Sequence, residues 1–181
     1  LCREGVDRRG LNFHELGMFA KSFDDANPVR VEPVPRLLAA IRAASSYSIA
    51  PNHPPDGGHF YVINAHDPLE AQKAYHREYR ILTAHETWPG HHLLDICRWS
   101  LASPLLRAVE QPVFYEGWAC FAETMVEMTG YMTDAADRLV VAKRRLWRAI
   151  RGNGDIGLQH GVITAEHAAH HLGPTGMTLD Q

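Results

Sequence analysis

The ten residues from Thr83 to His92 constrain this chain more than any other stretch. They read Thr-Ala-His-Glu-Thr-Trp-Pro-Gly-His-His. In an ordinary zinc-binding helix, His-Glu-x-x-His places two imidazoles one turn apart on the same metal, and the glutamate acts on water. Here the position four after His85 is Pro89, which cannot bind a metal and interrupts a helix. The sequence therefore predicts two helices that meet at Pro89-Gly90, with a metal site at their junction.

Two arrangements could supply the second imidazole. A kink or bulge at Pro89-Gly90 could bring His91 round to the metal, or a near-straight double turn could bring His92 onto the face of His85. At a rise of about 1.5 Å per residue, His92 would lie about 10 Å along the axis from His85, which two side chains on one ion could just span. We favour His91 and keep His92 as the alternative.

A second motif, Phe114 to Glu123, places the carboxylate of Glu116 near the start of an apolar helix. A buried glutamate is costly unless it is paired or bound to a metal. Zinc requires a third protein ligand and an open position. We therefore predict Zn²⁺ as the cofactor, held by His85, His91 and Glu116, although such a ligand set also suits manganese, cobalt or iron.

Four further residues are candidates for a role at this site. Glu86 is the candidate general base, which would act on zinc-activated water and then protonate the leaving nitrogen. Glu123 is the candidate acceptor for the second ring N–H of a ligand histidine; a salt bridge to an arginine is the alternative. His59 and Asn64 could line the cleft and bind substrate, although a loop position is the simpler interpretation for each.

The rest of the chain predicts a mainly α fold with one short strand or hairpin element. We expect a single domain over residues 1–181, with an extended segment at 31–67 and metal-site helices at 69–128. The strand is expected at His59–Asn64, where an edge strand could pair with substrate. The predicted helices are Pro35–Ala44, Leu69–Thr87, His91–Leu101, Val113–Met128 (mostly buried), Ala135–Arg151 (ended by Gly152-Asn153-Gly154) and Thr164–Leu172.

Composition narrows the classes of partner. The 18 Lys and Arg residues nearly balance the 21 Asp and Glu residues, so no basic field favours nucleic acid. No apolar run approaches the roughly 20 residues that a membrane span needs. A signal-peptide pattern is not seen and the first residue is leucine, so the compartment is left open.

The two motifs together resemble a known family, the bacterial domain of unknown function 885. The resemblance rests on His85-Glu86-x-x-Pro89-Gly90-His91-His92-Leu93 and on Glu116-Gly117-Trp118-Ala119-x-x-Ala122-Glu123. It implies a helical, gluzincin-like zinc metallopeptidase. Gly90-His91 is also similar to the Gly-His ending of the helical carboxypeptidase motif, which favours His91 over His92. Family members are usually longer and often exported, so we expect this chain to be a fragment.

The function that these observations favour is hydrolysis of an amide bond in a peptide or small amide substrate, with Glu86 as base. The alternatives are a metal- or substrate-binding domain that lacks catalysis, a hydrolase of a non-peptide bond, and a purely structural helical domain. Oligomeric state and the choice between endo- and exo-cleavage are not determined by the sequence.

Overall fold

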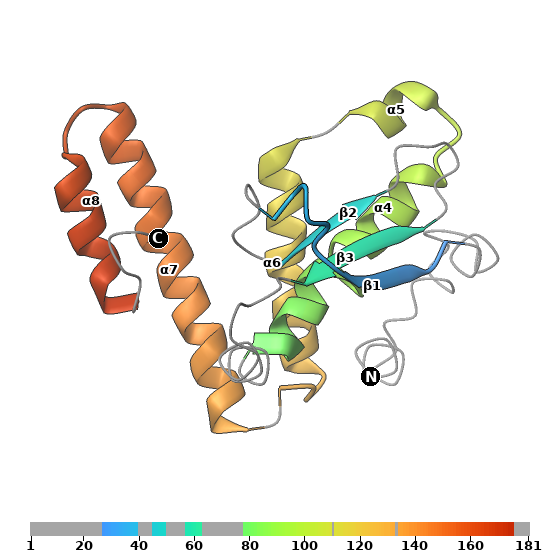
Figure 1. Ribbon diagram of the computed structural model, residues 1–181, viewed down its shortest axis with the longest axis horizontal. Coiled ribbons are helices and arrows are strands. Elements are labelled where there is room, and N and C mark those ends of the chain that lie inside the picture. The colour runs from blue at the N-terminus through green and yellow to red at the C-terminus, as the bar shows by residue number, and fades with distance from the viewer. Residues whose placement is uncertain are drawn as a thin grey trace. The chain divides into compact units, whose positions relative to one another are not determined.

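The structure of the protein is a computed structural model, which describes residues 27–39, 45–49, 57–62, 78–109, 111–132 and 134–175. The chain divides into two compact units, Leu1–Thr133 and Asp134–Gln181. The described residues are mostly helical and include a small three-stranded sheet (Figure 1). The predicted mainly α class with a short strand element is therefore confirmed.

The sheet of the first unit contains β1 (Val29–Pro33), β2 (Ser46–Ile49) and β3 (Gly58–Val62) in the order β1-β3-β2. β3 runs parallel to β1 and antiparallel to β2, with Tyr47 opposite Phe60. The strand predicted at His59 is present, but its expected place at the edge of a sheet is wrong. Because β3 is hydrogen-bonded on both sides, β1 and β2 are the edges of the described sheet.

Four helical segments build the rest of the described first unit. Residues 78–86 are helical, a turn covers 87–90, and α4 (His91–Trp99) follows at once. After the short α5 (Pro104–Ala108), α6 (Pro112–Met128) returns to pack against α4, which also contacts β2. The apolar side chains buried between these segments include Ile81, Ala84, Leu93, Ile96, Ala119, Ala122 and Val126.

The turn before α4 depends on the glycine at position 90. The Trp88–Pro89 peptide bond is cis, and the backbone N–H of His92 donates to the Thr87 carbonyl at 3.1 Å. A Cβ atom on Gly90 would overlap the carbonyl oxygens of Ala84 and His85. Only glycine therefore lets the chain fold back this closely on the end of the preceding helix.

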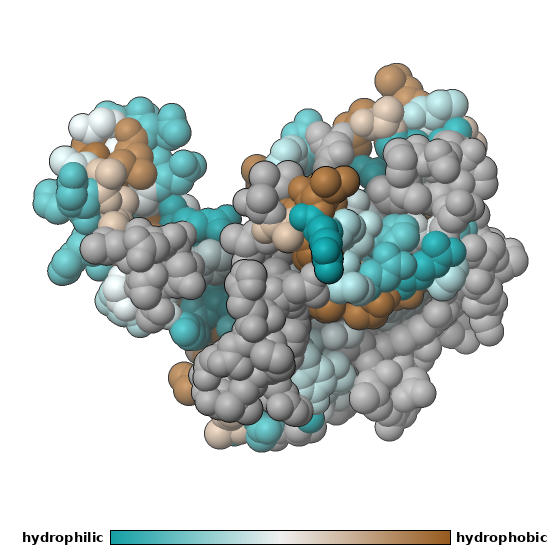
Figure 2. Space-filling view, viewed as in Figure 1, coloured by the Kyte–Doolittle hydropathy of each residue, from teal (hydrophilic) through white to brown (hydrophobic). Residues whose placement is uncertain are grey.

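The sequence predicted that α6 is mostly buried, and this prediction is wrong. Its buried residues lie along one face: Ala119, Ala122, Glu123, Met125 and Val126. Val113 is 89% exposed and Met128 74% exposed. Apolar and hydrophilic residues are intermixed over the face of the molecule in Figure 2. A run of apolar residues indicated a helix correctly but could not show how much of that helix the described chain covers.

The short helix predicted at Pro35–Ala44 is also wrong within the described residues. Residues 36–39 form a hydrogen-bonded turn, in which the backbone N–H of Ala39 donates to the Pro35 carbonyl at 3.1 Å. Residues 40–44 lie outside the described part of the chain.

The second unit is a helical hairpin of α7 (Ala135–Gln159) and α8 (Ala165–Leu172), followed by the 3₁₀ turn η1 (Gly173–Thr175). The predicted Thr164 cap is present, since its Oγ1 accepts from the His167 N–H at 3.3 Å. The predicted end of α7 at Gly152 is wrong. Gly154 and Gly157 lie inside α7 and are buried, where a Cβ would contact Ala168 and Ile163, so these glycines accommodate close packing instead of ending the helix.

Gly90→Ala tests the turn. We expect the substitution to lower the free energy of unfolding by about 1–3 kcal/mol or more, because the new methyl group meets backbone oxygens that cannot move aside. The matched control is Gly117→Ala in α6, where a Cβ would meet nothing within 4 Å. There we expect a gain of about 0.5–1 kcal/mol from helix propensity. Urea unfolding followed by circular dichroism measures both, and equal stabilities for the two variants would contradict this account of the turn.

Candidate metal centre

Three side chains from three helical segments converge on one point. His85 lies near the end of helical residues 78–86, His91 is the first residue of α4, and Glu116 lies in the second turn of α6. His85 Nε2 is 3.5 Å from Glu116 Oε2, and His91 Nε2 is 3.7 Å from Glu116 Oε1. One ligand atom from each residue lies within 4.8 Å of the others, so this group could hold a metal ion.

His91, and not His92, belongs to this group. The turn at Gly90 places the His91 ring 4.9 Å from the His85 ring, centroid to centroid, in an edge-to-face arrangement. The next residue, His92, is directed elsewhere, with its Nδ1 3.1 Å from the hydroxyl of Tyr47. Of the two arrangements left open by the sequence, the geometry corresponds to the kinked one.

A buried carboxylate orients the ring of His85. Glu123 is 1% exposed, and its Oε1 lies 2.8 Å from His85 Nδ1. Because a carboxylate only accepts, Nδ1 carries the proton in this pair, and Nε2, which is 3.5 Å from Glu116 Oε2, is the ring nitrogen available to a metal. Burial lowers the pKa of His85, but the hydrogen bonds to Glu116 and Glu123 and the negative charges of Glu86 and Glu123 together outweigh it, so the net pKa is raised.

Glu116 is not buried, contrary to the prediction from the sequence. The Glu116 side chain is 63% exposed, whereas the buried glutamate of α6 is Glu123. Glu116 nevertheless approaches both histidines, while its exposure leaves one side of the group open to solvent. The closeness of α6 also does not depend on Gly117, which faces open space. The Trp118 indole N–H instead donates to the carbonyl of Pro89 at 2.9 Å.

His91 is surrounded differently from His85. Its ring stacks on Tyr115 at 4.2 Å between centroids and lies nearly parallel to Tyr47 at 6.2 Å. Its Nδ1 is buried and has no hydrogen-bond partner among the described residues. Burial and then the positive charge of His85 lower the pKa of His91 to about 4, against a smaller opposing effect of Glu116. The neutral imidazole, which is the form that binds a metal, is therefore favoured.

Glu86 is only 7% exposed, so it is not an ordinary solvent-exposed glutamate on the surface of a helix. Its Oε2 accepts the backbone N–H of Tyr47 at 2.8 Å. Strand β2 therefore reaches the end of the first metal-site helix and holds the carboxylate that directly follows His85.

Three residues that surround the site were not predicted from the sequence: Tyr47, Asp95 and Tyr115. The hydroxyl of Tyr115 donates to Asp95 Oδ2 at 3.1 Å. Two of the three carried a signal, because Tyr115 directly precedes Glu116 and Asp95 lies one helical turn after His91. Tyr47 carried none, since 39 residues separate it from Glu86.

Of the two residues predicted to bind substrate, only His59 lies within the described residues. His59 lies on β3, where its Nδ1 is 3.1 Å from Glu32 Oε2 of β1 and its ring stacks on Tyr61. These contacts belong to the sheet, and they do not join His59 to the three metal-site side chains. Asn64 lies outside the described residues.

The donor set fits a divalent metal such as zinc. Two imidazole nitrogens and one carboxylate are a common ligand set for catalytic zinc, which keeps a fourth position open. The pairing of His85 Nδ1 with Glu123 adds the carboxylate–histidine contact that usually orients a metal ligand. We consider this buried pairing the strongest structural sign that the group is suited to a metal.

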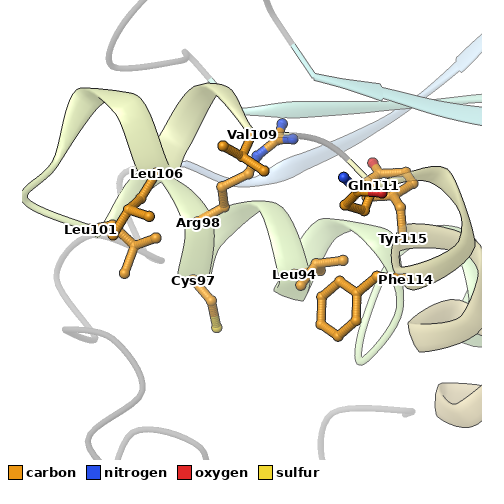
Figure 3. A pocket seen from close by; sticks show the side chains of 9 residues that line it. All are labelled: Leu94, Cys97, Arg98, Leu101, Leu106, Val109, Gln111, Phe114 and Tyr115. Carbon is orange, nitrogen blue, oxygen red and sulfur yellow. The ribbon is translucent and has the colours of Figure 1, made fainter.

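An apolar pocket of about 680 Å³ is lined in part by residues of α4 (Figure 3). α4, α5 and the start of α6 supply its lining, and Tyr115 belongs to both the pocket and the packing around His91. The other lining residues are Leu94, Cys97, Arg98, Leu101, Leu106, Val109, Gln111 and Phe114.

Comparison with known proteins gives two matches. The family model described as "Bacterial protein of unknown function (DUF885)" matches residues 14–177. A solved structure titled "The crystal structure of the putative lipoprotein from Colwellia psychrerythraea" is similar, with a TM-score of 0.74 and 25% sequence identity. The match covers 86% of this chain and 26% of that chain, so this chain spans about a quarter of its length. None of the curated proteins compared with the chain matches it. Among the described residues, no helix is long and apolar enough to cross a membrane.

Glu123→Gln tests the carboxylate behind His85. We expect the affinity for Zn²⁺ to fall by about 10- to 100-fold, because an amide cannot replace the charge that fixes the proton on His85 Nδ1. The control is Glu127→Gln, one helical turn further along α6. A competition titration with a zinc-binding dye measures both variants. Unchanged affinity in Glu123→Gln would show that this pair does not act on a metal.

Proposed function

The chain belongs to the bacterial family of unknown function DUF885, and from that starting point we propose that it is a zinc-dependent metallopeptidase. The observation that carries the proposal is the convergence of His85, His91 and Glu116 within 4.8 Å. Glu86 follows the first of these ligands directly, as the general base does in zinc peptidases. Its buried position beside the histidine sets the site apart from a purely structural metal site.

Each ligand would contribute in a way that its surroundings support. His85 would bind through Nε2, because Glu123 holds the proton on Nδ1. His91 would bind through Nε2 in its neutral form, and Glu116 would bind through its carboxylate. Zinc bound there would act as a Lewis acid that polarises a substrate carbonyl and increases the acidity of water.

Glu86 would carry the proton during the reaction. Its carboxylate would accept a proton from the attacking water and return it to the leaving amide nitrogen. The backbone N–H of Tyr47, 2.8 Å from Glu86 Oε2, would keep the carboxylate from rotating away. The substrate would approach from the side of Glu116, since His85 and His91 are only 6% and 4% exposed.

The second candidate is a domain that binds a metal or substrate without catalysis. The observation that favours it is the length comparison, because this chain spans about a quarter of the similar lipoprotein structure. Side chains that bind substrate could then be supplied by parts of a longer protein. A hydrolase of a non-peptide bond would use the same centre on a different carbonyl or phosphoryl group.

Metal binding is the first test. We expect elemental analysis of the purified chain to give about one zinc per chain, and His85→Ala and Glu116→Ala each to lose it. The matched control is His160→Ala, which removes an imidazole at the exposed end of α7. A wild-type chain that takes up no metal after zinc is supplied would overturn the proposed function.

Glu86→Gln separates catalysis from binding. We expect this variant to keep its zinc and to hydrolyse peptides about 10²- to 10⁴-fold more slowly, because the amide cannot accept the proton. Glu78→Gln, in the same helical segment, is the control and should leave the rate unchanged. A peptide-library digest followed by mass spectrometry provides the rate. Full activity in a zinc-loaded Glu86→Gln variant would rule out the proposed role of Glu86. Absence of activity in the zinc-loaded wild type would favour the binding domain.

A further inference from the structure

The side chain of Asp95 is completely buried, at 0% exposure, on the same helix as His91 and one turn after it. A buried carboxylate is unfavourable unless charged or hydrogen-bonding groups surround it. Arg98 forms an ion pair with it, with Nη2 2.9 Å from Oδ1. The hydroxyl of Tyr115 donates to Oδ2 at 3.1 Å. Asp95 is therefore the centre of a polar cluster inside the first unit.

Tyr47, from strand β2, joins the same cluster. Its pKa is raised by burial first, then by the negative charge of Asp95, and also by a hydrogen bond to Asp95. The Tyr47 hydroxyl also lies 3.1 Å from His92 Nδ1. One aspartate is thus a shared partner of two tyrosines that come from distant parts of the sequence.

The rings of both tyrosines pack on His91. The planes of the Tyr115 and His91 rings differ by 15°, with centroids 4.2 Å apart. For Tyr47 and His91 the angle is 20° and the separation 6.2 Å. Aromatic pairs in such offset, nearly parallel arrangements have a preferred geometry, so fixing the tyrosines restricts rotation of the imidazole.

The two histidines of the candidate site therefore differ in how they are held. His85 has a carboxylate on its second ring nitrogen, as metal-binding histidines usually do. His91 Nδ1 has no such partner among the described residues. Its ring orientation must come from packing, and the groups that pack on it are anchored to Asp95.

We propose that Asp95 is a positioning residue for His91: it holds the hydroxyls of Tyr115 and Tyr47, and their rings hold the imidazole with Nε2 directed at the metal position. The inference rests on the proposed function only in taking His91 as a metal ligand. It requires neither peptidase activity nor a particular substrate. Arg98 balances the charge of Asp95 and also lines the apolar pocket, as Figure 3 shows.

The test uses two variants that alter the cluster without touching a ligand. Asp95→Asn keeps the shape of the side chain but removes its charge, and we expect zinc affinity to fall about tenfold or more. Tyr115→Phe keeps the stacked ring and removes one hydrogen bond, so a loss of about two- to tenfold is expected. The matched control is Tyr79→Phe, whose hydroxyl contacts Arg80 at the surface; its affinity should equal that of the wild type.

A second measurement separates positioning from general loss of stability. Each variant is saturated with Co²⁺, and its visible absorption spectrum is compared with that of the wild type. A changed ligand geometry alters the bands even at full occupancy, whereas a variant that is merely less stable gives the wild-type spectrum from its folded fraction. We expect altered bands in Asp95→Asn and Tyr115→Phe and unaltered bands in Tyr79→Phe.

The outcomes are distinguishable. Wild-type affinity and an unaltered Co²⁺ spectrum in Asp95→Asn would overturn this inference and leave the proposed function intact. If Asp95→Asn does not fold, Tyr115→Phe decides, and wild-type behaviour in that variant would overturn the inference. A wild-type chain that binds neither zinc nor cobalt would overturn both proposals.

Discussion

The absence of a side chain at Gly90 is the constraint on which the site depends. The chain leaves one helix at Glu86 and begins the next at His91 within a turn so close that a methyl group would overlap the carbonyls of Ala84 and His85. This turn brings the two imidazoles to an edge-to-face distance of 4.9 Å. Trp118 then ties α6 to the turn through the carbonyls of Pro89 and Gly90. The position of Glu116 thus follows from the same few residues, because it is carried on α6 two residues before the tryptophan.

How much of this site could be predicted depended on whether the signal was local. His85, His91 and Glu116 lie in two short motifs, so their chemistry could be interpreted without knowing the fold, and Pro89 indicated the kink. Burial could not be interpreted in the same way. The apolar composition of α6 suggested that Glu116 is buried, whereas the buried carboxylate is Glu123, two helical turns further on and across from His85. Which face of a helix is covered depends on its neighbours, and a single sequence does not specify them.

Contacts between distant segments account for the other errors. β3 showed a strand pattern, but its central place depends on pairing with β1 and β2, which are separated from it by other residues. Gly152 and Gly154 resembled a helix end, yet Gly154 lies inside α7, where it faces Ala168 of α8. No local pattern indicated Tyr47, because the residues it contacts, Glu86 and His92, lie about 40 positions further along the chain. The sequence therefore indicated most of the helices and the three side chains that the structure brings together, but not Tyr47, Asp95 and Tyr115, which reach the group from other segments or other turns.

The unequal exposure of the three converging side chains has a kinetic consequence. The imidazoles are preformed and almost fully enclosed, whereas Glu116 is 63% exposed and belongs to a residue type with a large loss of side-chain entropy on ordering, roughly 1.5–2 kcal/mol. An incoming ion would meet the two histidines already in place and would order the glutamate last. Release of the ion would begin when the Glu116 side chain rotates into solvent. All three side chains would accordingly contribute to how tightly an ion is held, but the exposed carboxylate would govern how fast the ion exchanges.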